Sequence, residues 1–135
     1  MDVLITREAE LGIISMNALL RPKSPAWGLL LGHKRGPRFF VERILPAGGA
    51  GEVPDIGRLE DLNRLWEERI IGLFAVRPSA AFKRVVTGPY FYGKLFVAIR
   101  PAKKGFSVKP SVVEFDRKFF LSAIPRIPRP EGGKP

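Results

Sequence analysis

Apolar residues recur at helical spacing near the start of the chain. The apolar residues follow one another at steps of four, three and four, which places them on one side of a helix. They are Ala9, Ile13, Met16 and Leu20. Thr6 precedes this stripe and can cap the helix, and Pro22 follows it and ends the helical conformation at the residue before. The pattern predicts a helix over residues 6–20 with one buried face.

Two apolar runs come next, over residues 27–32 and 39–45, separated by the polar turn 33–37 with its glycine and proline. Short apolar runs joined by such a turn are typical of a β-hairpin. The first run, Trp-Gly-Leu-Leu-Leu-Gly, does not alternate apolar with polar residues, so both of its faces are expected to be buried. We therefore expect it to be a central strand of a sheet.

The rest of the chain contains one more helix and several strands. Leucine spacing predicts a helix over 55–69, with its apolar face formed by Leu59, Leu62, Leu65 and Trp66. Apolar runs predict four strands, over residues 70–76, 95–99, 106–109 and 112–115. This order lacks strict β–α alternation and predicts an α+β fold, with one domain over residues 1–124 built on a central mixed β-sheet with packed helices. A flexible Pro/Gly-rich tail is expected over 125–135.

The chain contains no cysteine and one histidine. Disulfides, thiolate metal sites and cysteine nucleophiles are therefore excluded, as is any site that needs two imidazoles from one chain. His33 falls in the expected hairpin turn, where a surface role is favoured, and Glu114 and Asp116 are interpreted as solvated charges on a strand. No cofactor is expected. The charged amino terminus and the lack of an apolar run of about 18 residues predict a cytoplasmic protein without a membrane span.

Positive charge is the unusual feature of the composition. The chain carries 23 Lys/Arg against 13 Asp/Glu, a formal net charge of +10 at pH 7. Such a balance attracts polyanions and leaves nucleic acid, an anionic membrane surface and an acidic protein open as partners. The cations are spread along the chain without a long block, which favours solvated faces with a basic bias.

Cations beside aromatic residues in expected loops are the candidates for binding. In single-stranded nucleic-acid sites, charge meets phosphate and rings meet bases. The first group lies at the hairpin turn, with Lys34, Arg35 and Arg38 next to Phe39 and Phe40. The second lies in a loop expected over 80–93 and consists of Lys83, Arg84, Tyr90, Tyr92 and the adjoining Lys94. A third group, Arg100, Lys103 and Lys104, lies in the turn after the strand 95–99.

The spacing of glycine, leucine and proline resembles that of the JAMM/MPN metalloprotease domain. Residues 24–46, with Gly28-Leu-Leu-Leu-Gly32 and then Ile44-Leu45-Pro46, resemble the opening hairpin of that family, which follows an amino-terminal helix. Residues 70–79 resemble its Gly-Trp-x-His-x-His-Pro-Ser strand, and 95–99 the strand after its catalytic loop. The resemblance covers residues 3–116 and implies an MPN/cytidine-deaminase-like layering of the domain.

The zinc and base positions of the resembled family are not kept in this sequence. Active members use two histidines and an aspartate to hold zinc, and a glutamate as the base toward the zinc-bound water. In this register the histidine positions hold Ala75 and Arg77, the aspartate position holds Gly88, and the glutamate position falls near Pro25. None of these side chains offers a lone pair to a metal. The resemblance therefore implies a metal-free pseudoenzyme that does not hydrolyse isopeptide bonds by the family's mechanism.

The resemblance also implies a protein-interaction or scaffold module as the function. Family members without the zinc motif commonly pair with another MPN-type domain, so a homo- or hetero-dimer with another protein is implied. Arg77, in the former metal pocket, is expected to hold a carboxylate of the partner. The alternative is a small basic nucleic-acid-binding protein, and an enzyme of unrelated mechanism ranks last.

Overall fold

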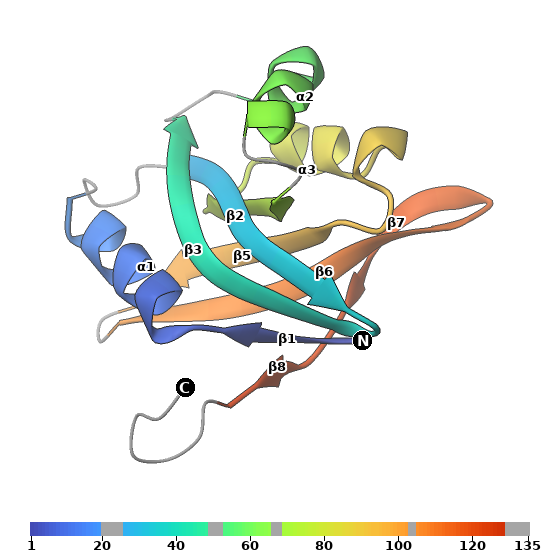
Figure 1. Cartoon of the computed structure of the whole chain (residues 1–135). Coiled ribbons are helices and arrows are strands. Elements are labelled where there is room, and N and C mark those ends of the chain that lie inside the picture. The colour runs from blue at the N-terminus through green and yellow to red at the C-terminus, as the bar shows by residue number, and fades with distance from the viewer. Residues whose placement is uncertain (20–25, 49–52, 66–68, 103–104, 129–135) are drawn as a thin grey trace.

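Figure 1 shows a computed structural model of the chain, which describes residues 1–19, 26–48, 53–65, 69–102 and 105–128. Within these residues the chain forms one α+β domain, a curled mixed sheet of eight strands with helices on both sides. In chain order the elements are β1 (Asp2–Ile5), α1 (Arg7–Leu19), β2 (Ala26–Arg35), β3 (Arg38–Gly48), α2 (Ile56–Leu65), β4 (Ile70–Val76), α3 (Ala80–Val86), the 3₁₀ helix η1 (Pro89–Phe91), β5 (Leu95–Pro101), β6 (Phe106–Asp116), β7 (Lys118–Ala123) and β8 (Arg126–Ile127).

The strand order across the sheet is β7-β6-β5-β4-β2-β3-β1-β8. Strand β1 is parallel to β3 and β8, and β4 is parallel to β5, whereas the other neighbours are antiparallel. Strand β2 lies between β3 and β4, and its residues 26–32 are all buried. This confirms the prediction of a central strand, which the continuous apolar run made possible.

Each face of the sheet has its own core, because successive side chains of a strand point to opposite sides. One core joins Ile13 of α1 to sheet residues such as Phe74. The other joins Leu59 of α2 and Phe82 of α3 to sheet residues such as Phe96. Figure 1 shows α1 on one side of the sheet, and α2 and α3 together on the other. We call the second side the α3 side.

The predicted first helix, hairpin and strand 70–76 are confirmed. Thr6 caps α1 as predicted, since its Oγ1 accepts a hydrogen bond from the Ala9 backbone N–H at 3.2 Å. The hairpin strands run further toward the turn than predicted, to Arg35 and Arg38, and only Gly36 and Pro37 remain as the turn. Gly36 has φ +54°, a left-handed conformation that glycine adopts without strain.

Other predictions are wrong. Residues 80–93, expected as a loop, contain α3 and η1. Residues 106–116 form a single strand instead of two, and β1 and β7 were not predicted at all. In α2, Leu59 is buried but Leu65 is 78% exposed, so the buried face does not reach the end of the helix. Trp66 lies outside the described residues.

The carboxyl-terminal boundary also differs from the expected one. Arg126 and Ile127 pair with β1, and the Arg126 guanidinium is 3.2 Å from a carboxylate oxygen of Glu10 in α1. The packed part of the chain therefore extends past residue 124, while residues 129–135 lie outside the description. In the part of the chain that the structure covers, no helix combines the length and the apolar composition needed to cross a bilayer.

Candidate functional site

Charge is segregated along the chain in a way that total composition hides. Residues 69–113 contain nine of the 23 Lys/Arg and none of the 13 Asp/Glu. This third of the chain therefore carries nine of the ten excess positive charges, and the remainder is close to neutral. The segment spans β4, α3, η1, β5 and most of β6, which are neighbours in the sheet or packed on it. The gap between Glu68 and Glu114 is the sequence signal that the reading of evenly spread cations missed.

Helix α3 presents two of the predicted binding residues to solvent. Ser79 caps the helix, because its Oγ accepts from the Phe82 backbone N–H at 3.1 Å. Phe82 and Val86, four residues apart, are buried against the sheet, at 3% and 1% exposure. Lys83 and Arg84 consequently lie on the outer surface and are exposed. They are held by a helix and not by the loop that the sequence predicted.

A second group of cations lies where β4 and β5 end. Arg77 follows β4 directly, and its backbone N–H donates to the Ile99 carbonyl of β5 at 3.1 Å. Arg100 follows Ile99 in β5. Lys109 of β6 pairs with Ala98, two residues before Arg100. Strand alternation places Arg100 and Lys109 on the α3 side of the sheet, and both are exposed. Of the predicted third group, Lys103 and Lys104 lie outside the described residues.

The two tyrosines lie at the opposite end of β5, around η1. Tyr90 packs edge-on against Phe91, and the Lys94 ammonium lies 5.7 Å from the Tyr90 ring centre. Tyr92 is 61% exposed and contacts Phe119 of β7 edge-on, with ring centres 6.3 Å apart. Aromatic surface thus adjoins Lys94 at this end of the sheet.

Six cations of this segment share the α3 side or its rim and have no acidic partner among the residues that the structure describes. Within the described ranges, the ion pairs of the protein use Asp2, Glu10, Glu42 and Asp61, none of which belongs to the segment. We call the six residues the cationic face. They are Arg77, Lys83, Arg84, Lys94, Arg100 and Lys109. A surface of unpaired cations with adjoining aromatic rings is suited to a polyanion that also has flat apolar groups.

The structure does not bring all predicted binding residues together. Lys34 and Arg35 are exposed at the tip of the β2–β3 hairpin, and the Lys34 ammonium lies 5.1 Å from the Phe39 ring centre. Figure 1 shows this tip well away from α3. Phe39 is buried, at 2% exposure, and its ring belongs to the core on the α1 side of the sheet. The hairpin cations therefore form a separate basic patch.

Of the positions compared with the zinc motif, Ala75 is buried, and Arg77 and Gly88 lie at opposite ends of α3. Ala75 is 1% exposed and is part of the core on the α3 side. Arg77 precedes α3 and Gly88 follows it, so a helix of seven residues, about 10 Å long, stands between them. Pro25 lies outside the described residues. Within the described ranges, no three His, Asp or Glu side chains are grouped as metal ligands.

The histidine takes part in a small charged cluster on the hairpin. His33 Nδ1 donates to Glu42 Oε1 at 2.9 Å, and the Arg69 guanidinium is 3.2 Å from the same oxygen. The imidazole also stacks on Phe40, with ring centres 4.8 Å apart. The hydrogen bond from His33, together with the charge of Arg69, lowers the pKa of the Glu42 carboxyl. The cluster links β2, β3 and the start of β4 at the sheet surface.

Comparison with known proteins gives a fold relative and no family. No protein-family model matches the chain, and no curated protein matches it. Among solved structures, the chain is similar to protein DSY2949 from Desulfitobacterium hafniense, determined in solution. The TM-score is 0.61 and the sequence identity 21%, over 96% of this chain and 95% of that one. At this identity the similarity extends to the fold over nearly the whole of both chains.

Proposed function

We propose that this protein is a non-catalytic binding module and that its cationic face binds nucleic acid. The observation that carries the proposal is the run of 45 residues, 69–113, with nine cations and no acid, in which Lys94 lies over the ring of Tyr90 near exposed Tyr92. Phosphates would meet the cations, and unstacked bases would meet the aromatic rings. Single-stranded nucleic acid is the form that offers both groups at once.

The dimensions of the cationic face fit a short stretch of a polynucleotide. Lys94 and Arg100 are separated by the length of β5, about 20 Å at a rise of about 3.3 Å per residue. A single strand would place several phosphates along that distance. If between three and six cations contact phosphates, log K should fall with log salt at a slope of about −2 to −4, because each contact releases about 0.7 counterion. Between 50 and 200 mM salt, affinity should then fall by about 15- to 250-fold.

Two Lys-Arg dipeptides of this chain allow a controlled test. The double variant Lys83→Gln, Arg84→Gln removes two charges from the cationic face, and Lys34→Gln, Arg35→Gln removes the same two charges from the hairpin tip. Binding of an oligonucleotide of about 12 unstructured nucleotides is measured by fluorescence anisotropy over a salt series. We expect the first variant to lose about tenfold in affinity and about 1.4 in slope, and the second to change little. An equal loss of affinity in both variants would mean that binding depends on net charge and not on the cationic face, which contradicts the proposal. An affinity that does not change with salt would also refute it.

A second candidate function follows from Arg77 and the resemblance to the JAMM/MPN domain. We propose that a metal-free module of this kind captures a carboxylate of a protein partner through Arg77. What supports it is a half-buried guanidinium that, within the described residues, has no acidic partner.

The second candidate is tested by affinity capture after nuclease treatment, so that nucleic acid does not bridge the proteins. Arg77→Ala is compared with Arg100→Ala, which removes an equal charge from the neighbouring strand. Selective loss of a captured protein with Arg77→Ala supports carboxylate capture. An unchanged set of captured proteins contradicts it.

A further inference from the structure

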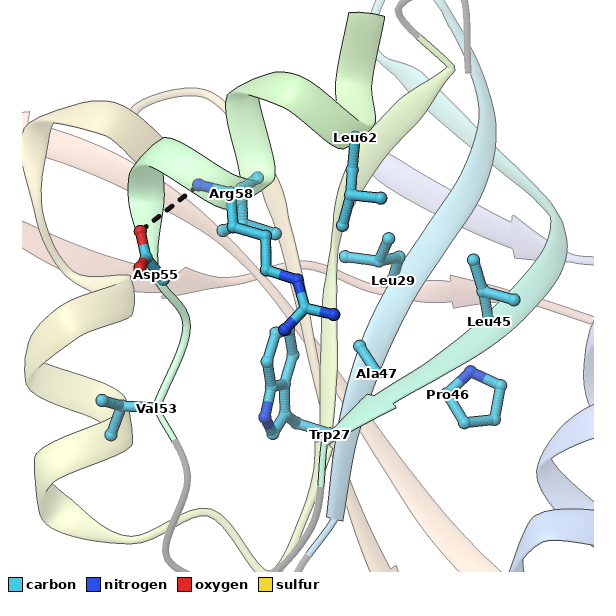
Figure 2. A pocket seen from close by; sticks show the side chains of 10 residues that line it. Trp27, Leu29, Leu45, Pro46, Ala47, Val53, Asp55, Arg58 and Leu62 are labelled. Atoms are coloured by element: carbon cyan, nitrogen blue, oxygen red, sulfur yellow. Dashed lines mark hydrogen bonds between the residues drawn. The ribbon is translucent and has the colours of Figure 1, made fainter. Parts of the chain in front are cut away.

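A groove of about 250 Å³ lies between α2 and the β2–β3 hairpin, apart from the cationic face (Figure 2). Its walls are mostly apolar, and a small number of polar groups reach it from α2 and from Trp27. It is lined by Trp27, Leu29, Leu45, Pro46, Ala47, Val53, Asp55, Arg58, Leu59 and Leu62. Small-molecule sites are typically concave and apolar with a few directed polar groups, at about 300–1,000 Å³. The groove has this composition at the small end of the range.

Trp27 brings an unused hydrogen-bond donor to this groove. Its side chain is 8% exposed, and its Nε1 is buried with no acceptor among the described residues. The indole N–H can only donate, so its partner must be an acceptor atom. Buried donors without an acceptor are rare in folded proteins, and each calls for a specific explanation. The nitrogen has no surface open to the groove in this conformation, so an acceptor supplied by an occupant reaches it once the indole turns toward the groove.

Arg58 brings a positive charge to the same place. Figure 2 shows its side chain extending from α2 toward the indole of Trp27. Within the described residues no carboxylate pairs with its guanidinium. Asp55 also lines the groove, and its Oδ1 accepts the Arg58 backbone N–H at 3.3 Å, which holds this carboxylate at the start of α2. The guanidinium is the donor that remains directed at the groove.

We propose that this groove binds a small monocarboxylate with an apolar body of about ten non-hydrogen atoms. A cavity of about 150 Å³ holds benzene with its six carbons, and the same ratio gives about ten atoms for this volume. The carboxylate oxygens accept from the Arg58 guanidinium and, once the indole has turned toward the groove, from the Trp27 N–H, and the body lies against the leucine side chains of the walls. A groove of this size encloses one small molecule and is too short for a helix or an extended peptide.

Phenylacetate, with ten non-hydrogen atoms, is the probe, and its neutral amide is the matched control. Titration is followed by ¹H–¹⁵N correlation spectra, in which the indole N–H of Trp27 gives its own signal. The chain has two tryptophans, so the signal is assigned by its loss in Trp27→Phe. We expect phenylacetate to bind at least about tenfold more tightly than phenylacetamide and to shift the Trp27 indole proton downfield. Equal binding of acid and amide, or a Trp27 signal that does not move, overturns the proposal.

Variants on the exposed side of α2 complete the test without disturbing the core. Arg58→Gln should weaken phenylacetate binding about tenfold, since hydrogen bonds to charged groups contribute more than neutral ones. Arg64→Gln removes the same charge from the same helix, at a residue that pairs with Asp61 and does not line the groove. It should bind phenylacetate like the unmodified protein. Equal affinity in all three proteins contradicts the role of Arg58.

Discussion

Replacing Gly72 by alanine should separate the two strands on which the cationic face is built. Gly72 of β4 pairs with Leu95 of β5, and this is the first of five register pairs between these strands. A Cβ at residue 72 would overlap the Leu95 carbonyl oxygen, with the carbonyl carbon only 2.7 Å away. The obstacle is backbone, so a side-chain rotation cannot relieve it.

The cost of Gly72→Ala can be worked from this geometry. Heavy atoms in contact prefer separations of about 3.5–4.0 Å, so the strands must part locally by about 1 Å. Overpacking of this kind costs about 1–3 kcal/mol, and each ladder hydrogen bond that is lost adds about 1 kcal/mol. We therefore expect a loss of about 3 kcal/mol or more in the free energy of unfolding. With a urea m-value of about 2 kcal/mol per molar, the midpoint should fall by about 1.5 M.

Gly57→Ala provides the matched control for this experiment, because it is the same substitution in the exposed helix α2. There the added Cβ meets only a carboxylate oxygen of Asp55 at 3.4 Å. Alanine is a better helix former than glycine, by up to about 1 kcal/mol, so this variant should be as stable or more stable. Urea unfolding is followed by circular dichroism for both variants. A Gly72→Ala midpoint equal to that of the unmodified protein would refute the close approach of β4 and β5 at this pair.

Three further expectations concern a pKa, a helix cap and a turn. The pKa of Glu42 is lowered in the folded state, so its contribution to stability is fully present above the pKa of the unfolded chain, about 4.3, and is lost as the pH falls through the lower pKa of the folded chain. Glu42→Gln should thus cost up to about 1 kcal/mol at pH 7 by urea unfolding and progressively less in acid, and a cost that stays the same as the carboxyl is protonated would contradict this. Ser79→Ala should cost about 1 kcal/mol, measured the same way, because it removes the cap of α3, and an unchanged midpoint would argue against the cap. Arg117→Gly should raise the thermal midpoint by relieving a φ of +66°, at a gain of up to about 1 kcal/mol, and a lower midpoint would contradict the left-handed conformation.

Elements with a strong local signal could be predicted from the sequence. The Thr6 cap and the apolar stripe that follows determine α1, and the continuous apolar run of β4 determines its bounds. Helix α3 lacks such a signal because it has only seven residues, too few to be stable alone. It is stabilised by the burial of Phe82 and Val86 against a sheet formed by distant residues. That contribution depends on tertiary structure and is not visible in local spacing.

Strand β6 shows how a correct local rule can mislead. Pro110 divides the run 106–116, and proline normally marks the end of a strand because it has no backbone N–H. In the sheet, Pro110 pairs with Val97 of β5 and lies just beyond the last register pair of β7, where a missing donor costs little. Strand β7 was overlooked for a related reason. Its pairing partner is the part of β6 that follows the proline, so both segments depend on one tertiary arrangement.

The sequence could supply the residue types of the candidate site but not their arrangement, because charge had to be counted by segment and then placed on the fold. The sequence offered seven candidate binding residues, but it did not show how they group on the fold. Lys83 and Arg84 join Arg77 and Arg100 through the β4–α3–β5 connection, whereas Lys34 stays on a separate hairpin. The groove beside Trp27 had no sequence signal, since its walls come from three separate segments.

The backbone at Arg77 connects this charge arrangement to function. Arg77 has φ +51°, a conformation that costs an L-residue about 1–2 kcal/mol, and it also precedes a proline, which favours an extended residue before it. Glycine would remove this cost, as it does at the turn residue Gly36. Strain of this kind is typical of sites where the side chain is used. Here the strained residue places a cation beside Arg100 and Lys109, where like charges repel one another. The backbone strain at Arg77 and the repulsion among these cations both oppose folding of the free protein. An anionic ligand on the cationic face reduces the repulsion. Binding of a polyanion should therefore stabilise the fold more than binding of a neutral ligand would. The residues responsible are the same ones that the proposed function requires.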